Sequence, residues 1–132
     1  MDDFPDGVRA AGRYRGPVTE LPELQTTVTT EVRDGVHVIA VAGELDLYST
    51  PQLTEQFDAA PGDGQVVLDL TAVTFMDSTA LGGILLAARR IGTAGGRLSL
   101  VVSDPATTKL ISMVGIDRVV PVHETVDAAL QG

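Results

Sequence analysis

The feature that most constrains the fold of this chain is a short apolar run, residues 65–70, between a turn and a helical segment. Its sequence is Gln-Val-Val-Leu-Asp-Leu, and the turn residues Pro-Gly-Asp-Gly stand directly before it. Nearly continuous apolar residues over so short a run are typical of a strand that is buried on both faces. Such strands belong mostly to parallel sheets whose faces are covered by helices. The run therefore predicts an α/β fold.

The segments around this strand carry alternating strand and helix patterns. Alternating apolar residues on either side of Asp34-Gly35 predict a β-hairpin that opens the fold. Helical spacing predicts helices at about 49–60, 78–93, 104–113 and 124–130. Further strands are expected at 97–102 and 119–122. We therefore predict a mixed sheet of about four to five strands that opens with a hairpin and carries about four helices.

The chain is expected to form one domain after an N-terminal tail. Residues 1–24 mix charged residues with Gly and Pro and show neither a helical nor a strand period. We interpret them as a flexible tail. Residues 25–132 then make up a domain that is long enough to bury its core without disulfides or a metal.

Charge and composition exclude several classes of function. The 18 acidic and 9 basic residues give a net charge of -9, which repels nucleic-acid backbones and anionic membranes. There is no cysteine, so disulfides and thiol nucleophiles are excluded, and neither histidine has a second one at metal-ligand spacing. We expect no metal and no cofactor. Since we also find no signal peptide and no apolar run long enough to span a membrane, we expect a cytoplasmic protein with no membrane partner.

Asp77-Ser78 stands at the head of the 78–93 helix and allows two interpretations. The simpler one is that Ser78 is the N-cap, whose hydroxyl accepts a hydrogen bond from the first turn. The alternative is that Ser78 accepts a phosphate. The positive end of a helix tolerates a phosphate, whose nearly two negative charges would repel a partner without unfolding the domain.

The 78–93 helix has an expected core face and an expected outer face. The core face comprises Leu81, Ile84, Leu85, Ala88 and Ile91, and the outer face comprises Thr79, Gly82, Gly83, Leu86 and Arg90. Two glycines inside a helix cost about 1 kcal/mol each relative to Ala when they are exposed, so a compensating role is expected. Either a partner's backbone approaches them, or they pack closely within the domain. Exposed Leu86 beside them favours a partner.

Three segments of residues 25–132 resemble the STAS domain of bacterial anti-sigma factor antagonists. They are Gly43-Glu44-Leu45-Asp46, Asp69-Leu70-Thr71 and the run from Phe75 to Gly82. The resemblance implies a partner switch in transcription: the unphosphorylated protein binds an anti-sigma factor that is also a serine kinase, and so releases the sigma factor. One departure is Ala80, where the family often has Gly.

The resemblance also implies roles for particular residues. Ser78 corresponds to the serine that the kinase phosphorylates, which abolishes binding, and Thr79 is a lesser alternative acceptor. A serine phosphatase of the metal-dependent class would reverse the reaction. Asp77 adjoins the acceptor, and Asp46 helps shape the binding surface. The expected partner-binding residues are Asp46, Asp77, Ser78, Thr79, Gly82, Gly83, Leu86 and Arg90.

Three other functions remain open alternatives. A STAS scaffold or ligand-sensing module would never be phosphorylated. A small serine hydrolase would use Ser78 with His123, but the places two residues before and after Ser78 are Met76 and Ala80, not the Gly of a nucleophile elbow. A receiver domain would need paired acidic residues after its first strand, whereas this chain opens with a hairpin. We therefore expect no catalytic residue and no enzymatic activity.

Overall fold

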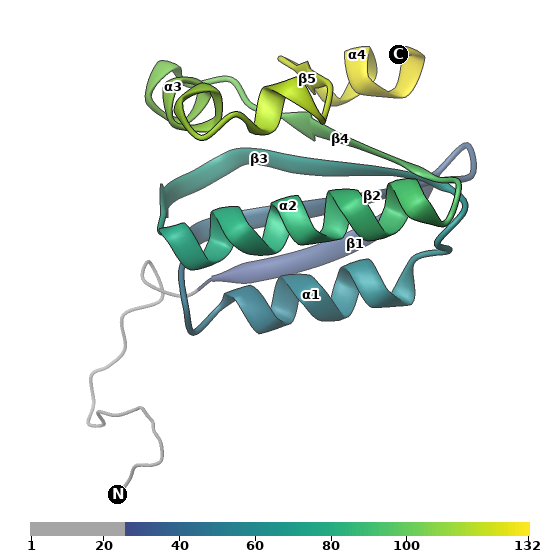
Figure 1. The fold of residues 1–132 in the computed structure, drawn as a ribbon, viewed down its shortest axis with the longest axis horizontal. Coiled ribbons are helices and arrows are strands. Elements are labelled where there is room, and N and C mark those ends of the chain that lie inside the picture. The colour runs from purple at the N-terminus through teal and green to yellow at the C-terminus, as the bar shows by residue number, and fades with distance from the viewer. Residues whose placement is uncertain (1–25) are drawn as a thin grey trace, which may run out of the picture.

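The computed structural model describes residues 26–132 and shows the expected α/β fold (Figure 1). In chain order the elements are β1 (Thr27–Arg33), β2 (Val36–Leu45), α1 (Thr50–Ala59), β3 (Gln65–Met76), α2 (Ser78–Thr93), β4 (Arg97–Val101), α3 (Pro105–Met113), the 3-10 helix η2 (Ile116–Arg118), β5 (Val122–His123) and α4 (Val126–Gln131). The sheet has the order β1-β2-β3-β4-β5. β1 pairs antiparallel with β2, and the other pairs are parallel. The prediction of a mixed sheet of about four to five strands with about four helices is confirmed, and the sheet has five strands.

The opening hairpin forms at the predicted Asp-Gly pair. Asp34 and Gly35 have φ angles of 51° and 80°, so both adopt the left-handed conformation of a type I′ turn. Arg33 and Val36 close the hairpin as directly paired residues. The turn thereby fixes the register of β1 against β2.

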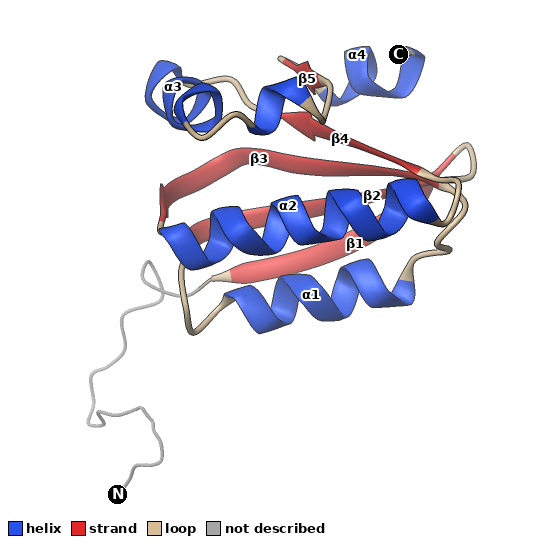
Figure 2. Ribbon diagram, in the orientation of Figure 1, coloured by secondary structure: helices blue, strands red, loops and turns tan. Residues whose placement is uncertain are grey.

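Helices cover the two faces of the sheet unequally (Figure 2). Ile39, Leu68 and Leu100 are paired neighbours on β2, β3 and β4, and they lie in the core that also buries Leu53 of α1 and Ile84 of α2. A smaller cluster on the other face holds Val36, Val38, Val67 and Val101 with Ala129 of the short helix α4. The apolar run in β3 is thus buried on both faces, as its composition predicts.

β3 is longer than the sequence pattern indicates. The expected strand ended at residue 70 and a short loop led to the helix, but the strand continues to Met76. A shift in register lets residues 72–76 pair with the end of β2, and Val73 and Met76 are buried between exposed neighbours. Thr71 and Thr74 interrupt the apolar residues at a spacing of three, which does not match the alternation of a strand, so the sequence of this second half resembles a loop. Only Asp77 separates β3 from α2.

The C-terminal elements also differ from the prediction. The last strand was expected at 119–122, but η2 occupies 116–118, Val119 is exposed, and β5 comprises Val122 and His123. The final helix begins at Val126, because the Thr125 hydroxyl is its N-cap and accepts a hydrogen bond from Ala128 N at 3.1 Å. Within the described residues, no helix combines the length and the apolar character that crossing a membrane requires.

The N-cap of α3 makes a pH-dependent contribution to stability. The Asp104 carboxylate accepts a hydrogen bond from Thr107 N at 2.9 Å, and this bond holds the pKa of Asp104 below its ordinary value. The folded state therefore binds the proton more weakly than the unfolded state. The contribution is complete above the unfolded pKa of about 4 and is lost as the pH falls through the folded pKa.

We expect the stability advantage of wild type over Asp104→Ala to be constant near neutral pH and to shrink as the pH falls below about 4. Urea unfolding of both proteins at several pH values measures this difference. A difference that stays the same down to the lowest pH at which both proteins fold would contradict the role of the ionised carboxylate.

Candidate functional site

The candidate site lies at the edge of the sheet where β2 and β3 end (Figure 1). Leu45 and Met76 are paired at the ends of these parallel strands. The loop that follows β2 and the start of α2 are therefore neighbours, although they are far apart in the sequence. This arrangement brings Asp46, Asp77 and Ser78 to one edge of the molecule.

Asp77 ties the start of α2 to the loop after β2. One carboxylate oxygen accepts a hydrogen bond from Ala80 N, and the other accepts one from Leu47 N, each at 3.0 Å. Asp77 N in turn donates to the carbonyl of Leu45 at 3.2 Å. Asp77 is therefore the N-cap of α2, and the interpretation of Ser78 as the cap is wrong. The cap lies one residue earlier because β3 extends up to Asp77.

Ser78 is the first residue of α2 and is exposed to solvent. Within the described part of the chain its hydroxyl has no hydrogen-bond partner, and the N–H groups of Ser78 and Thr79 find no acceptor there either. These N–H groups are two of the donors that the first turn of a helix leaves unpaired. Ser78 thus offers a hydroxyl that the fold does not use, at the positive end of a sixteen-residue helix.

A small hollow of about 240 Å³ adjoins Ser78. Its lining comprises Ser78, Leu81, Gly82 and Leu85 of α2 with Val114 and Ile116, which follow α3. The hollow is mainly apolar, so Ser78 stands at the polar rim of an apolar surface.

The Asp46 carboxylate shapes the loop after β2. One of its oxygens accepts hydrogen bonds from Tyr48 N and Ser49 N, both at 3.0 Å, and from the Ser49 hydroxyl. These bonds hold the loop in a tight turn that presents Leu47 and Tyr48, whose exposed fractions are 56% and 85%. Asp46 therefore fixes the shape of its own loop, and the two apolar side chains beside it were missed by the sequence analysis.

The outer face of α2 divides into two parts. Gly82 faces open space and Leu86 is 55% exposed, as expected. Gly83 is half-buried, and a Cβ atom added there would lie 3.2 Å from the Thr50 methyl group of α1. Arg90 forms an ion pair with Asp58 of α1. For Gly83, close packing within the domain therefore replaces the expected open groove.

The core face of α2 also differs in detail. Leu81, Ile84 and Ile91 are buried as expected, but Leu85 and Ala88 are only half-buried. Ala80 and Ala87 are buried in addition. The helix is rotated in this way because α1 packs against one side of it, which the pattern within α2 alone does not reveal.

The two glycines of α2 predict opposite effects of added side chains. Gly82→Ala is expected to raise the free energy of unfolding by about 0.4–1 kcal/mol, because Ala restricts the unfolded chain and meets nothing in the fold. In Gly83→Leu the side chain would collide with Thr50, so we expect clear destabilisation. Urea unfolding compares the variants. A Gly83→Leu protein as stable as wild type would contradict the packing of α1 against α2.

More apolar side chains are exposed near this edge. Phe75 is the next-to-last residue of β3, beside the site, and Met113 and Val114 lie where α3 ends. The sequence analysis missed these exposed side chains because it placed Phe75 in a loop, and because Met113 and Val114 look like ordinary core residues at the end of a helix. One feature of the sequence could have indicated an exposed apolar surface here: the large apolar residues Met113 and Val114 stand directly before Gly115, where the helix ends.

His123 does not support a catalytic serine. It lies on β5 beside Gly132, which follows α4, whereas Ser78 heads a helix on the other face of the sheet. In the part of the chain that the structure describes, no histidine is hydrogen-bonded to the Ser78 hydroxyl. The arrangement lacks the serine–histidine pair that a nucleophilic hydrolase requires.

Comparison with known proteins identifies the family. The model of the STAS domain family matches residues 27–129. The chain belongs to the STAS family. At the Ser78 edge of this STAS domain two of the three motifs that resemble the family meet, Gly43-Glu44-Leu45-Asp46 and the run from Phe75 to Gly82, whereas Asp69-Leu70-Thr71 lies further back along β3.

Several proteins that are similar to this STAS domain are anti-sigma factor antagonists. The anti-sigma F factor antagonist of Paenibacillus polymyxa is 30% identical over 104 residues, which are 76% of this chain and 89% of that protein. The anti-sigma-F factor antagonist RsfB of Mycobacterium tuberculosis is 30% identical over 108 residues, which are 80% of this chain and 88% of that protein. The crystal structure of an anti-sigma factor antagonist from Mycobacterium paratuberculosis has a TM-score of 0.74 and 32% identity, and covers 86% of this chain and 97% of its own.

Proposed function

We propose that this STAS domain is an anti-sigma factor antagonist that is switched off by a phosphate on Ser78. Its unphosphorylated form binds an anti-sigma factor that is also a serine kinase, and binding releases the sigma factor. The observation that carries the proposal is the exposed and unused Ser78 hydroxyl at the head of α2. The relatives named above are antagonists of anti-sigma factors, which supports the choice of partner.

The surroundings of Ser78 explain how one phosphate acts. A phosphoserine adds close to two negative charges, and the unpaired N–H groups at the start of α2 accommodate them without unfolding the helix. The nearby carboxylates of Asp46 and Asp77 already make this edge acidic. A partner whose surface fits the neutral hydroxyl then meets a dense negative charge and a larger group.

The proposed partner-binding surface consists of Asp46, Asp77, Ser78, Thr79, Gly82 and Leu86, and we call it the switch surface. Gly83 and Arg90 contact α1 and are therefore left out of this surface. A serine phosphatase of the metal-dependent class restores the neutral hydroxyl. Because sigma factors act on RNA polymerase, the protein works in the cytoplasm and controls transcription without contacting DNA.

The test uses each anti-sigma factor serine kinase encoded in the genome from which the chain comes. One kinase is expected to bind the chain and, with ATP, to place one acid-stable phosphate on Ser78, located by mass spectrometry. Thr79→Ala is expected to take its single phosphate on Ser78 as well, which distinguishes Ser78 from Thr79 as the acceptor. Ser78→Ala should take no phosphate and should stay bound in the presence of ATP.

Two outcomes would contradict the proposal. If no kinase binds or modifies the chain, a STAS scaffold or ligand-sensing module that is never phosphorylated becomes the better interpretation. If Ser78 is required for turnover of an activated ester, the protein is a hydrolase instead.

A further inference from the structure

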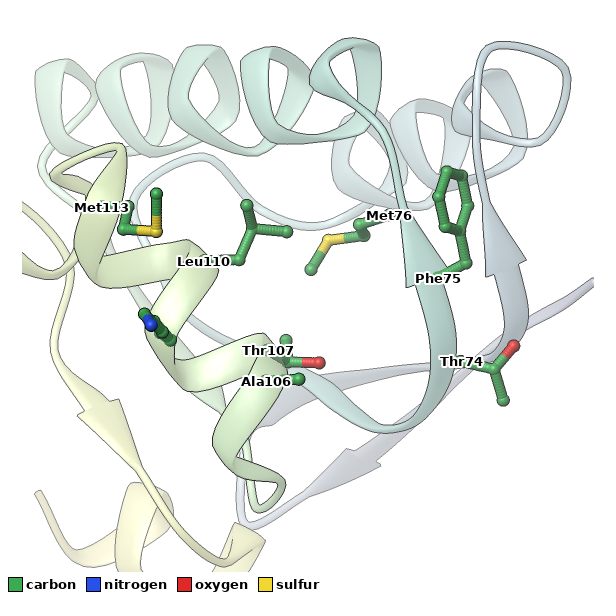
Figure 3. A pocket seen from close by; sticks show the side chains of 8 residues that line it. Thr74, Phe75, Met76, Ala106, Thr107, Leu110 and Met113 are labelled. Carbon is green, nitrogen blue, oxygen red and sulfur yellow. The ribbon is translucent and has the colours of Figure 1, made fainter.

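A second and larger hollow lies beside the switch surface, between the end of β3 and helix α3. Its volume is about 420 Å³, and we call it the α3 hollow. Its lining comprises Thr74, Phe75, Met76, Ala106, Thr107, Lys109, Leu110 and Met113. Figure 3 shows that Met76 from β3 and Leu110 from α3 point toward one another across it, whereas Phe75 points away.

The lining of the α3 hollow is apolar and adaptable. Met76 and Met113 both line it, and Met113 is 72% exposed. Methionine side chains are flexible and fit differently shaped apolar groups, which makes them common at protein-binding surfaces. Within the described residues, the surface thus provides a place for a large apolar side chain that the domain itself does not fill.

The α3 hollow is continuous with the surface around Ser78. Met113 lines the α3 hollow, and the next residue, Val114, lines the small hollow that adjoins Ser78. A partner that covers Ser78 and contacts Val114 is therefore next to Met113, which lines the second hollow. The two hollows are therefore neighbours at the end of α3, where Met113 and Val114 are both exposed.

The α3 hollow has one basic side chain in its lining, next to the Asp104 carboxylate that caps α3, whereas the charged side chains of the switch surface are both acidic. Lys109 lines the α3 hollow and is the only lysine of the chain. Among residues 26–132 it forms no ion pair. The Asp46 and Asp77 carboxylates lie on the other side, at the switch surface. A partner that complements this surface has an acidic residue that faces Lys109, next to the apolar side chain that enters the α3 hollow. The part of the partner that covers Ser78 is not acidic.

We propose that the α3 hollow is the anchor site for a large apolar side chain of the anti-sigma factor, with an acidic neighbour that faces Lys109. This inference rests on the proposed function. The interface then has two parts: the α3 hollow supplies affinity in both states of the protein, and the switch surface responds to phosphate. Buried apolar anchors of this kind carry a large share of the binding energy of protein interfaces.

The test measures the affinity of the anti-sigma factor kinase for wild type and variants by calorimetry without ATP. Met113→Gln removes the apolar side chain and adds no charge at the end of α3, and we expect at least about a tenfold loss of affinity. Lys109→Gln should weaken binding more in low salt than in high salt. Val32→Thr is the matched control, because Val32 is also an exposed apolar residue but lies near the hairpin turn on β1. The Val32→Thr protein should bind the kinase with the same affinity as wild type.

A second measurement needs no variant. In wild type labelled at the methionine methyl groups, the NMR resonances of Met76 and Met113 should shift when the kinase binds. The anchor site would be overturned if Met113→Gln bound with the affinity of wild type and the two methionine resonances did not shift. The proposed function would still stand in that case, provided that Ser78→Asp lost binding. If wild type bound no anti-sigma factor kinase at all, the proposed function would fail. The assignment of the α3 hollow to a side chain of the anti-sigma factor would then fail as well.

Discussion

Ser78→Asp is expected to weaken binding of the anti-sigma factor kinase at least about 100-fold, because it places a fixed carboxylate where the partner meets a neutral hydroxyl. Like charges brought together at an interface cost several kcal/mol, and about 2.7 kcal/mol corresponds to 100-fold. Ser78→Ala keeps the surface neutral and should bind within a few-fold of wild type. Calorimetric titration without ATP measures both variants.

The matched control for this variant separates local charge from net charge. Gln131→Glu adds one negative charge at the end of α4, away from the switch surface (Figure 1). It changes the shape of the side chain very little and should leave the affinity unchanged. If Gln131→Glu weakened binding as much as Ser78→Asp, general repulsion from a chain of charge -9 would explain the effect, and the role of Ser78 would be refuted.

Leu68→Ala is expected to lower the free energy of unfolding by about 2–5 kcal/mol. Leu68 is completely buried in the middle of β3, where it is paired with Ile39 and Leu100 on the neighbouring strands. Truncation removes apolar contacts and leaves a cavity beneath α1 and α2. Because domains of this kind have a total stability of about 5–15 kcal/mol, the loss is a large share of it.

Urea unfolding of Leu68→Ala is compared with that of Leu86→Ala, an exposed leucine on α2. The exposed variant should lose less than about 1 kcal/mol, since it leaves no buried cavity. Equal losses in the two variants would contradict the position of β3 at the centre of the fold.

The parts of the fold that the sequence predicts are those encoded by neighbouring residues. Asp34-Gly35 adopts the left-handed turn that closes the hairpin, because a local backbone preference decides it. The apolar run of β3 predicts burial on both faces, and the centre of the core is there. The Asp77-Ser78 pair marks the start of α2, although the cap is Asp77 and not Ser78.

The parts that the sequence does not predict depend on contacts between distant segments. Gly83 appears exposed from its place on α2, but Thr50 of α1 lies against it. The second half of β3 looks like a loop until β2 supplies its pairing partners. The α3 hollow joins Met76 with Leu110, so it exists only when β3 and α3 are brought together.

The central claim is that a phosphate on Ser78 controls binding to an anti-sigma factor. The most direct measurement titrates the anti-sigma factor kinase with the same chain before phosphorylation, after stoichiometric phosphorylation at Ser78, and after a serine phosphatase has removed the phosphate. We predict tight binding, a loss of at least about 100-fold, and full recovery. Equal affinity in the three states would contradict the account.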